Sequence, residues 1–217
     1  MKKIKDVAII DYDMGNVRSI ENAIDHCGEY KIIVTNESNQ ILNADTIILP
    51  GVGAYPDAMR KLKNRNLISI LNKAVIEQKK PTLGICLGMQ LLFEESEEKG
   101  ITEGLGWIPG KVRYMMPGHG LRVPHIGWNS LIIQTNDNLF NFLKTDKDFY
   151  FVHSLHAECD DKFVLAKFNY GVQMNAAVRN NNIIGMQFHP EKSQKNGLAL
   201  LNSFFEWALL EVNKDND

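Results

Sequence analysis

Along the first half of the chain, short apolar runs alternate with segments whose apolar residues recur at helical spacing. The runs are typical of short strands buried on both faces of a sheet, and they lie at 7–11, 31–35, 46–49 and 82–85. Apolar residues at helical spacing predict helices at 16–27, at 56–79 in two pieces broken near 64–66, and at 87–99. This alternation predicts an α/β fold with a mostly parallel central sheet flanked by helices.

The pattern changes after residue 110, where strand-like pieces follow one another with few helices between them. These pieces lie at 111–115, 129–133, 149–153, 163–168, 172–178 and 183–188. Short connections favour antiparallel hairpins, and three asparagines at 180–182 predict a turn. A closing amphipathic helix is expected at about 197–212. We therefore expect additional antiparallel strands in the C-terminal half of a single domain over 1–217, with its core at about 7–210.

The composition suits one globular domain and argues against several classes of protein. The chain has 217 residues, 44% of them hydrophobic and 23% charged, so it can bury a sizeable core. A net charge of -2 without a basic stripe argues against nucleic-acid binding. No run approaches the roughly 20 apolar residues that span a membrane, and no signal peptide precedes the first strand. Three cysteines argue against a disulfide framework and for a cytoplasmic protein.

The sharpest chemical signal is the segment at 84–88 (GICLG), between a predicted strand and a predicted helix. This G-x-C-x-G pattern is the cysteine counterpart of the nucleophile elbow, a strained turn that needs small neighbours. The start of the helix would favour a thiolate at Cys86, and the Leu87 amide could help to bind an oxyanion. Most free cysteines are buried core residues, which is our interpretation of Cys27. Cys159, which has no elbow, is interpreted as incidental.

His189 and Glu191 are the candidates for the base and its orienting group, which a nucleophilic cysteine needs. His189 follows the predicted strand at 183–188, and Pro190 separates it from Glu191. Side chains two apart share a face of an extended chain, so the carboxylate could orient the imidazole. An isolated His-Pro-Glu segment would more simply be a surface strand end; combined with the elbow, it predicts a triad. We expect no metal, because no common zinc spacing relates the histidines at 119, 125, 153 and 156.

The loop at 50–53 (PGVG) follows a predicted buried strand and should lie at the carboxyl edge of the sheet. Its glycine-rich backbone could turn amide groups toward a developing oxyanion. Gly51 and Gly53 also imitate part of a dinucleotide fingerprint, but Pro56 stands where the third glycine should be. We therefore interpret the loop as part of an oxyanion hole.

Two segments together resemble the paired signatures of the class I (triad) glutamine amidotransferases. They are 84–90 (GICLGMQ) and 187–191 (QFHPE), in the expected order. The resemblance implies the single-domain fold of that family and hydrolysis of glutamine to glutamate and ammonia, without a cofactor. Cys86 would attack the side-chain amide, His189 would take and return a proton, and water would hydrolyse the glutamyl thioester. The oxyanion and glutamine-binding positions that it implies are Gly51, Val52, Leu87, Gln90, His153 and Ser154.

Further segments resemble the glutaminase subunits of imidazole glycerol phosphate synthase. They are 11–16 (DYDMGN), 50–55 (PGVGAY), 124–129 (PHIGWN), 150–154 (YFVHS) and 188–193 (FHPEKS). The resemblance implies a heterodimer with a (β/α)8-barrel cyclase, which uses the ammonia to make imidazole glycerol phosphate in histidine biosynthesis. It also implies that Asn16, Trp128 and Lys192 face the barrel. From the residues alone, Asn16 could instead cap a helix, Trp128 could be half-buried core, and Lys192 could be solvated.

Three other functions stay open at this point. Paralogues with the same signatures feed ammonia to enzymes that amidate a surface-polysaccharide sugar, and the stretches at 180–182 and 192–197 differ slightly from the histidine-pathway pattern. The elbow alone would suit a stand-alone cysteine hydrolase. A regulatory domain that kept the fold could have lost a triad member, but all three are present.

Overall fold

A computed structural model describes residues 4–118, 120–143 and 147–214. Within them, eight strands form the main sheet in the order β2-β1-β3-β4-β14-β13-β12-β9. Their bounds are β1 Asp6–Ile10, β2 Lys31–Thr35, β3 Thr46–Leu49, β4 Thr82–Ile85, β9 Ile132–Ile133, β12 Val164–Tyr170, β13 Val172–Asn180 and β14 Ile183–Met186. The strands from β2 to β14 run parallel, and the remaining pairs are antiparallel. The predicted mostly parallel sheet with an antiparallel extension is confirmed.

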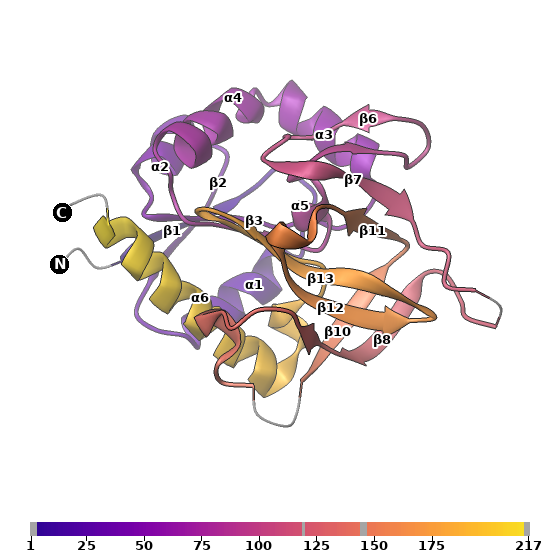
Figure 1. Cartoon of the computed structure of the whole chain (residues 1–217). Helices are drawn as coiled ribbons and strands as arrows, with labels where there is room; N and C mark the ends of the chain where they lie inside the picture. The colour runs from indigo at the N-terminus through magenta and orange to yellow at the C-terminus, as the bar shows by residue number, and fades with distance from the viewer. Residues whose placement is uncertain (1–3, 119, 144–146, 215–217) are drawn as a thin grey trace.

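Helices cover both faces of this sheet, as predicted (Figure 1). They are α1 Val17–Asp25, α2 Ser38–Asn43, α3 Tyr55–Asn64, α4 Leu67–Asn72, α5 Leu87–Gln90 and α6 Gln194–Lys214, with shorter turns η1 Lys73–Glu77, η2 Asn138–Phe140, η3 Asp161–Phe163 and η4 Pro190–Lys192. Alternate residues of β1 point to opposite sides: Ile9 packs in a cluster with α1 and α6, and Ile10 in one with α3 and α4. The sheet therefore separates two apolar cores.

The predicted helix at 87–99 is wrong beyond its first turn. After α5 the chain enters β5 (Phe93–Ser96), which belongs to a second sheet in the order β11-β7-β5-β6, with β6 Thr102–Glu103, β7 Ile108–Tyr114 and β11 Leu155–Glu158. Phe93 and Ser96 are buried, and Glu95 pairs with Lys111 of β7, with 2.9 Å between the charged atoms. These cross-strand partners lie far away in sequence, so local spacing could not reveal them.

A third, two-stranded sheet pairs β8 (His125–Ser130) with β10 (Asp148–His153) in antiparallel register, with His125 opposite His153. The predicted strand at 129–133 is therefore two strands, β8 and β9, on different sheets. The predicted domain limits stay a prediction. Among the described residues, no helix combines the length and apolar character that crossing a membrane requires.

Candidate active site

Cys86 lies in a strained turn between β4 and α5. Its φ of 54° and ψ of -111° are rare for a residue with a side chain. Both flanking glycines are needed for space: a Cβ on Gly84 would lie 2.8 Å from the Gly88 carbonyl oxygen, and one on Gly88 would collide with the Leu49 carbonyl. The Cys86 amide donates to the Met186 carbonyl at 2.7 Å. The turn thus holds the Cys86 side chain at the carboxyl edge of the sheet, where it is 7% exposed.

The other two cysteines have no such setting. Burial raises the pKa of Cys27 to about 11. Burial and the neighbouring Asp160 and Asp161 carboxylates raise the pKa of Cys159 to about 11. Both groups are therefore protonated thiols at neutral pH, which makes them poor nucleophiles.

His189 and Glu191 meet side by side, although the backbone between them is not the extended strand we expected. β14 ends at Met186, and Glu191 lies in η4. The His189 Nδ1 atom is 2.7 Å from Glu191 Oε1, and both side chains are almost fully buried. The His189 amide donates to the Tyr150 carbonyl at 2.9 Å, which ties the turn to β10. The tight turn, rather than strand periodicity, brings the two side chains together.

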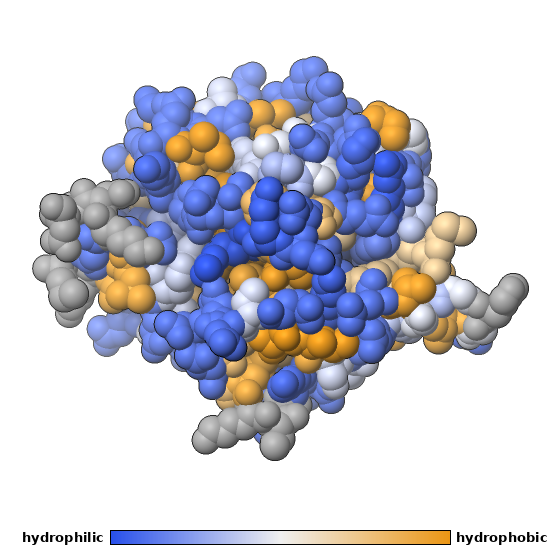
Figure 2. Space-filling view, in the orientation of Figure 1, coloured by the Kyte–Doolittle hydropathy of each residue, from blue (hydrophilic) through white to orange (hydrophobic). Residues whose placement is uncertain are grey.

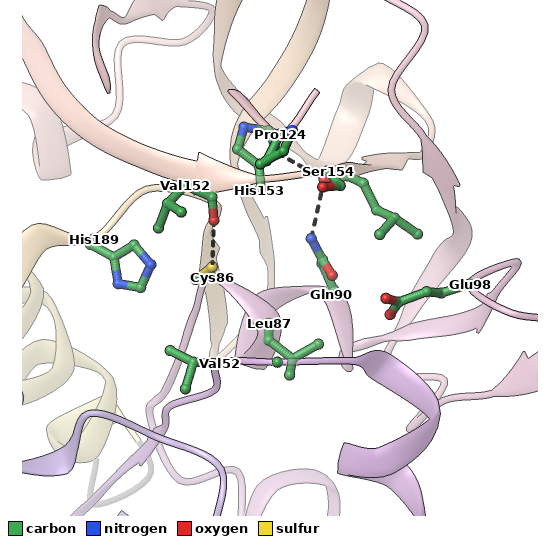
Figure 3. Close-up of a pocket in the computed structure, with 12 residues that line it drawn as sticks. Val52, Cys86, Leu87, Gln90, Glu98, Pro124, Val152, His153, Ser154 and His189 are labelled. Carbon is green, nitrogen blue, oxygen red and sulfur yellow. Dashed lines mark hydrogen bonds between the residues drawn. The ribbon is translucent and has the colours of Figure 1, made fainter. Parts of the chain in front are cut away.

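The His189 ring is charged at neutral pH in this setting. Burial alone would lower its pKa, but the Cys86 sulfur and the Glu191 carboxylate outweigh burial and raise the pKa from 6.5 to about 9. The Nε2 atom has no hydrogen-bond partner among the described residues. Figure 3 shows the ring edge turned toward Cys86. Glu191 therefore holds one edge of the ring, and Cys86 and His189 line the same cavity.

A cavity of about 320 Å³ opens in front of the Cys86 sulfur. Most of the predicted oxyanion and glutamine-binding residues line it, namely Val52, Leu87, Gln90, His153 and Ser154. Gly51 lies just behind the wall, where a Cβ would be 2.8 Å from the Gly88 amide nitrogen. The volume suits a ligand of amino-acid size.

The amides predicted for the oxyanion hole are not equally available. The Val52 amide donates to the Met14 carbonyl at 3.3 Å, so it does not point to a ligand in this conformation. The Leu87 amide begins α5, and the first amides of a helix have no partner within it. Because α5 has only one turn, it supplies amide groups rather than a large helix dipole.

Gln90 and His153 are held by internal hydrogen bonds at the back of the cavity. Gln90 Nε2 donates to the Leu155 carbonyl at 3.2 Å and to Gln187 Oε1 at 3.0 Å. His153 Nδ1 is 2.8 Å from the same carbonyl, and its ring contacts His125. Burial lowers the pKa of His153 to about 3, so the ring is neutral. It lines the cavity without a free ring nitrogen.

Sequence reasoning missed two residues at the site: Glu98, which lines the cavity, and Gln187, which is buried beside Cys86. Glu98, which lines the cavity mouth, accepts from the Tyr55 amide at 2.6 Å; the wrong helix prediction hid it among neighbouring acidic residues. Gln187 donates toward the Cys86 sulfur at 3.9 Å. It stands in the 187–191 signature, which was the available signal, but no role was given to it.

The three residues predicted to face a partner lie on the surface, and two of them flank one ring. Asn16 is exposed and its side chain does not cap α1. Trp128 is 48% exposed and packs edge-on against Tyr150 at 5.9 Å between ring centres. The Lys192 ammonium lies 6.0 Å from the centre of the same ring. Of the histidines considered for zinc, His119 lies outside the described residues.

The family model for "Glutamine amidotransferase class-I" matches residues 8–207. The chain belongs to this family. Among its amidotransferase relatives, "Imidazole glycerol phosphate synthase subunit HisH 2" of Vibrio vulnificus is 62% identical over 94% of this chain and 96% of that protein. HisH 1 of Campylobacter jejuni is 44% identical over 91% of this chain and 98% of its own length. HisH of Bacillus cereus is 47% identical over 91% of this chain and 93% of its own length. Within the class-I amidotransferases, the chain groups with HisH subunits.

Solved structures show the same amidotransferase fold. The Thermotoga maritima PurLQS structure aligns over 94% of this chain and 98% of that chain, with a TM-score of 0.70 and 22% identity. A glutamine amidotransferase from Thermotoga maritima aligns over 96% of this chain and 99% of that chain, with a TM-score of 0.65 and 13% identity. At these identities the likeness concerns the fold alone.

Proposed function

We propose that this amidotransferase hydrolyses glutamine with Cys86, His189 and Glu191 and delivers the ammonia to a partner synthase. The observation that carries the proposal is the Cys86 sulfur at the base of an amino-acid-sized cavity, beside a His189 ring that is hydrogen-bonded to Glu191. Glu191 orients the imidazole and stabilises its charge. The glutamine side-chain amide would enter between Gln90 and the Val52 loop.

The charged His189 sets the order of proton transfers. The Cys86 thiolate, paired with the imidazolium, attacks the amide carbon of glutamine. His189 then gives its proton to the leaving nitrogen, and ammonia departs. Neutral His189 next takes a proton from water, which attacks the thioester and releases glutamate and the thiolate. Each cycle returns the proton to His189, so no cofactor is needed.

Two backbone amides would bind the oxyanion that forms in both steps, those of Val52 and Leu87. The bond from the Val52 amide to Met14 leaves this hole incomplete until the loop at 50–53 changes conformation. Removing one such donor typically slows an enzyme by about 10²–10³-fold. We therefore expect weak glutaminase activity from the isolated chain and a large activation in the complex.

Glu98 is a candidate for holding the α-amino group of glutamine. It carries the one carboxylate among the described residues that line the cavity, and it lies at the mouth, away from Cys86 (Figure 3). A cationic amino group would pair with it while the side-chain amide reached the sulfur.

The partner is a (β/α)8-barrel cyclase, and the product is imidazole glycerol phosphate of histidine biosynthesis. The support is the 62% identity to a HisH subunit over nearly the whole chain, together with exposed Asn16, Trp128 and Lys192. Asn16 shares the loop at 11–16 with Met14, so a partner at Asn16 would be close to the carbonyl that holds Val52. We place this complex in the cytoplasm.

The central test is Cys86→Ala in the complex with the cyclase. Glutamine-dependent synthesis should fall by at least about 10³-fold, because the nucleophile is gone. Synthesis from added ammonium salts should stay within twofold of wild type, since free ammonia needs no thiolate. A diazo-oxo-norleucine adduct on wild type should map to Cys86. Loss of both activities in a folded complex, or an adduct elsewhere, would contradict the proposal; fast turnover of γ-glutamyl peptides without partner would favour a stand-alone hydrolase.

A further inference from the structure

His125 and His153 form a buried pair of rings at the wall of the cavity, and neither ring takes part in the chemistry above. His125 on β8 stands directly opposite His153 on β10, with 5.4 Å between ring centres. Both are buried, at 3% and 6% exposed. The His125 ring also packs against Phe151, Phe168 and Tyr170, with ring centres 4.1–5.6 Å apart. Two polar rings in such an apolar setting need hydrogen-bond partners.

The hydrogen bonds fix which nitrogen of His153 carries the proton. The Leu155 carbonyl can only accept, so His153 Nδ1 donates to it at 2.8 Å. In a neutral imidazole the other nitrogen must then be an acceptor. His153 Nε2 lies 3.3 Å from His125 Nδ1, and His125 is therefore the donor. Burial lowers the pKa of both rings, which agrees with a neutral pair.

The same carbonyl connects this pair to the nucleophile. Leu155 O accepts from Gln90 Nε2 as well, Gln90 donates to Gln187, and Gln187 donates toward the Cys86 sulfur. A chain of hydrogen bonds therefore runs from His125 to Cys86, beside the wall that would face the glutamine substrate. A change at its outer end would shift Gln90, the member that lines the cavity.

We propose that His125 is a positioning residue for glutamine: its donation to His153 Nε2 anchors the ring, which the Leu155 carbonyl fixes as the Nδ1–H tautomer, and so holds the Leu155 carbonyl and Gln90 in place. The inference rests on the proposed glutaminase function and adds a residue to which that function gave no role. It assigns His153 a structural role at the cavity wall, in place of direct contact between its ring nitrogens and the substrate.

Three substitutions separate donation from packing. His125→Asn keeps an N–H near the position of Nδ1 but loses the ring. His125→Phe keeps a ring and loses the donor, and His125→Leu matches Asn in shape without a donor. In the complex, His125→Asn should leave the KM for glutamine within about threefold of wild type. His125→Phe and His125→Leu should each raise this KM about tenfold, with a smaller change in kcat. Ammonium-driven synthesis should not change.

A packing role alone predicts the reverse order, with Phe closest to wild type, and that result would overturn the inference. If Phe fails to fold, the Asn and Leu pair makes the same comparison. Nitrogen-15 NMR of the imidazoles gives a readout that does not depend on activity. The His153 ring should keep the Nδ1–H tautomer throughout, and its Nε2 resonance should show an accepted hydrogen bond in wild type and His125→Asn that is lost in His125→Phe and His125→Leu. A His153 Nε2 resonance that is the same in every variant would overturn the inference, whereas a wild-type complex without glutaminase activity would count against the proposed function.

Discussion

The backbone at Cys86 holds conformational strain that its surroundings must maintain. A side chain at φ 54° and ψ -111° costs on the order of 1–3 kcal/mol. Hydrogen bonds from the Cys86 amide to Met186 and from the Gln90 amide to Cys86, at 2.7 and 3.1 Å, fix the turn on both sides. The close approach of Gly88 to Leu49 leaves no room for relaxation. The strained turn holds the buried sulfur at the wall of the cavity.

The pKa of His189 predicts a pH dependence of stability. The pKa rises from 6.5 in the unfolded chain to about 9 in the folded one, so the folded state binds the proton more tightly. The stabilisation is complete below pH 6.5 and is lost as the pH rises through about 9; its size is on the order of 3 kcal/mol. Glu191→Gln should lower the pKa of His189 and so reduce the loss of stability at alkaline pH.

Urea unfolding of wild type and Glu191→Gln, measured from pH 6 to 10, checks this prediction. Only the difference between the two curves is diagnostic, because Cys27 and Cys159 also titrate in the alkaline range. The difference in free energy of unfolding between wild type and Glu191→Gln should narrow between pH 6.5 and 9. Parallel curves across that range would mean that Glu191 does not hold the proton on His189.

Local patterns predicted the elements around Cys86 well and failed where a distant strand decided the structure. The strand at 82–85 and the elbow depend on neighbouring residues, and both are present as expected. The stretch after α5 has helical spacing as well, but its burial and its pairing with β7 come from residues that follow it by about fifteen positions. This is why Glu98 was missed: its place at the cavity depends on the second sheet, which the sequence did not predict.

The turn η4 offers a test at the level of a single element. Ser193 is buried; its hydroxyl donates to the His189 carbonyl at 2.6 Å and accepts from the Tyr150 amide at 3.0 Å. Ser193→Ala should remove the first bond and leave the Tyr150 amide unpaired. We expect this to lower the free energy of unfolding by about 1–3 kcal/mol. We expect kcat for glutamine to fall about tenfold with little change in KM, because the loosened turn misplaces His189 rather than the substrate.

Chemical unfolding and glutaminase kinetics in the complex measure both effects. Ser203→Ala on α6 is the control, because this serine lines a surface groove near Asn138 and Arg179 and is not part of the active site. Equal kinetics for Ser193→Ala and wild type would show that β10 and η4 hold His189 without the hydroxyl.

At the scale of the whole molecule, the site follows from the topology of the parallel strands. β1, β3, β4 and β14 all end at one edge, so the loops at 11–16 and 50–53, the elbow and η4 converge there. This convergence could be predicted from the sequence, since it requires only strand order and direction. The wall formed by β8 and β10 could not, because its two strands are separated by residues 131–147 and pair with each other across that gap.

The same wall gives the molecule an exposed apolar surface beside the site. On β8, Ile126 and Trp128 are 61% and 48% exposed, and Met116, Leu121 and Val123 of the loop before it are also exposed. Figure 2 shows apolar residues around this loop, at the right of the view. Exposed apolar groups that cluster at a site mouth are typical of partner surfaces.

Trp128→Ala should therefore weaken binding of the cyclase partner without unfolding the chain. A central aromatic residue of an interface commonly contributes about 2 kcal/mol or more, or roughly a 30-fold change in Kd. Leu210→Ala is the matched control: this residue is 58% exposed on α6 and lines a groove with Asn181 and Asn182, at the opposite edge of the sheet. Calorimetric titration with the cyclase measures both. Equal weakening by the two substitutions, or none by Trp128→Ala, would place the interface elsewhere, and the charged Lys192 beside Tyr150 would then need another explanation.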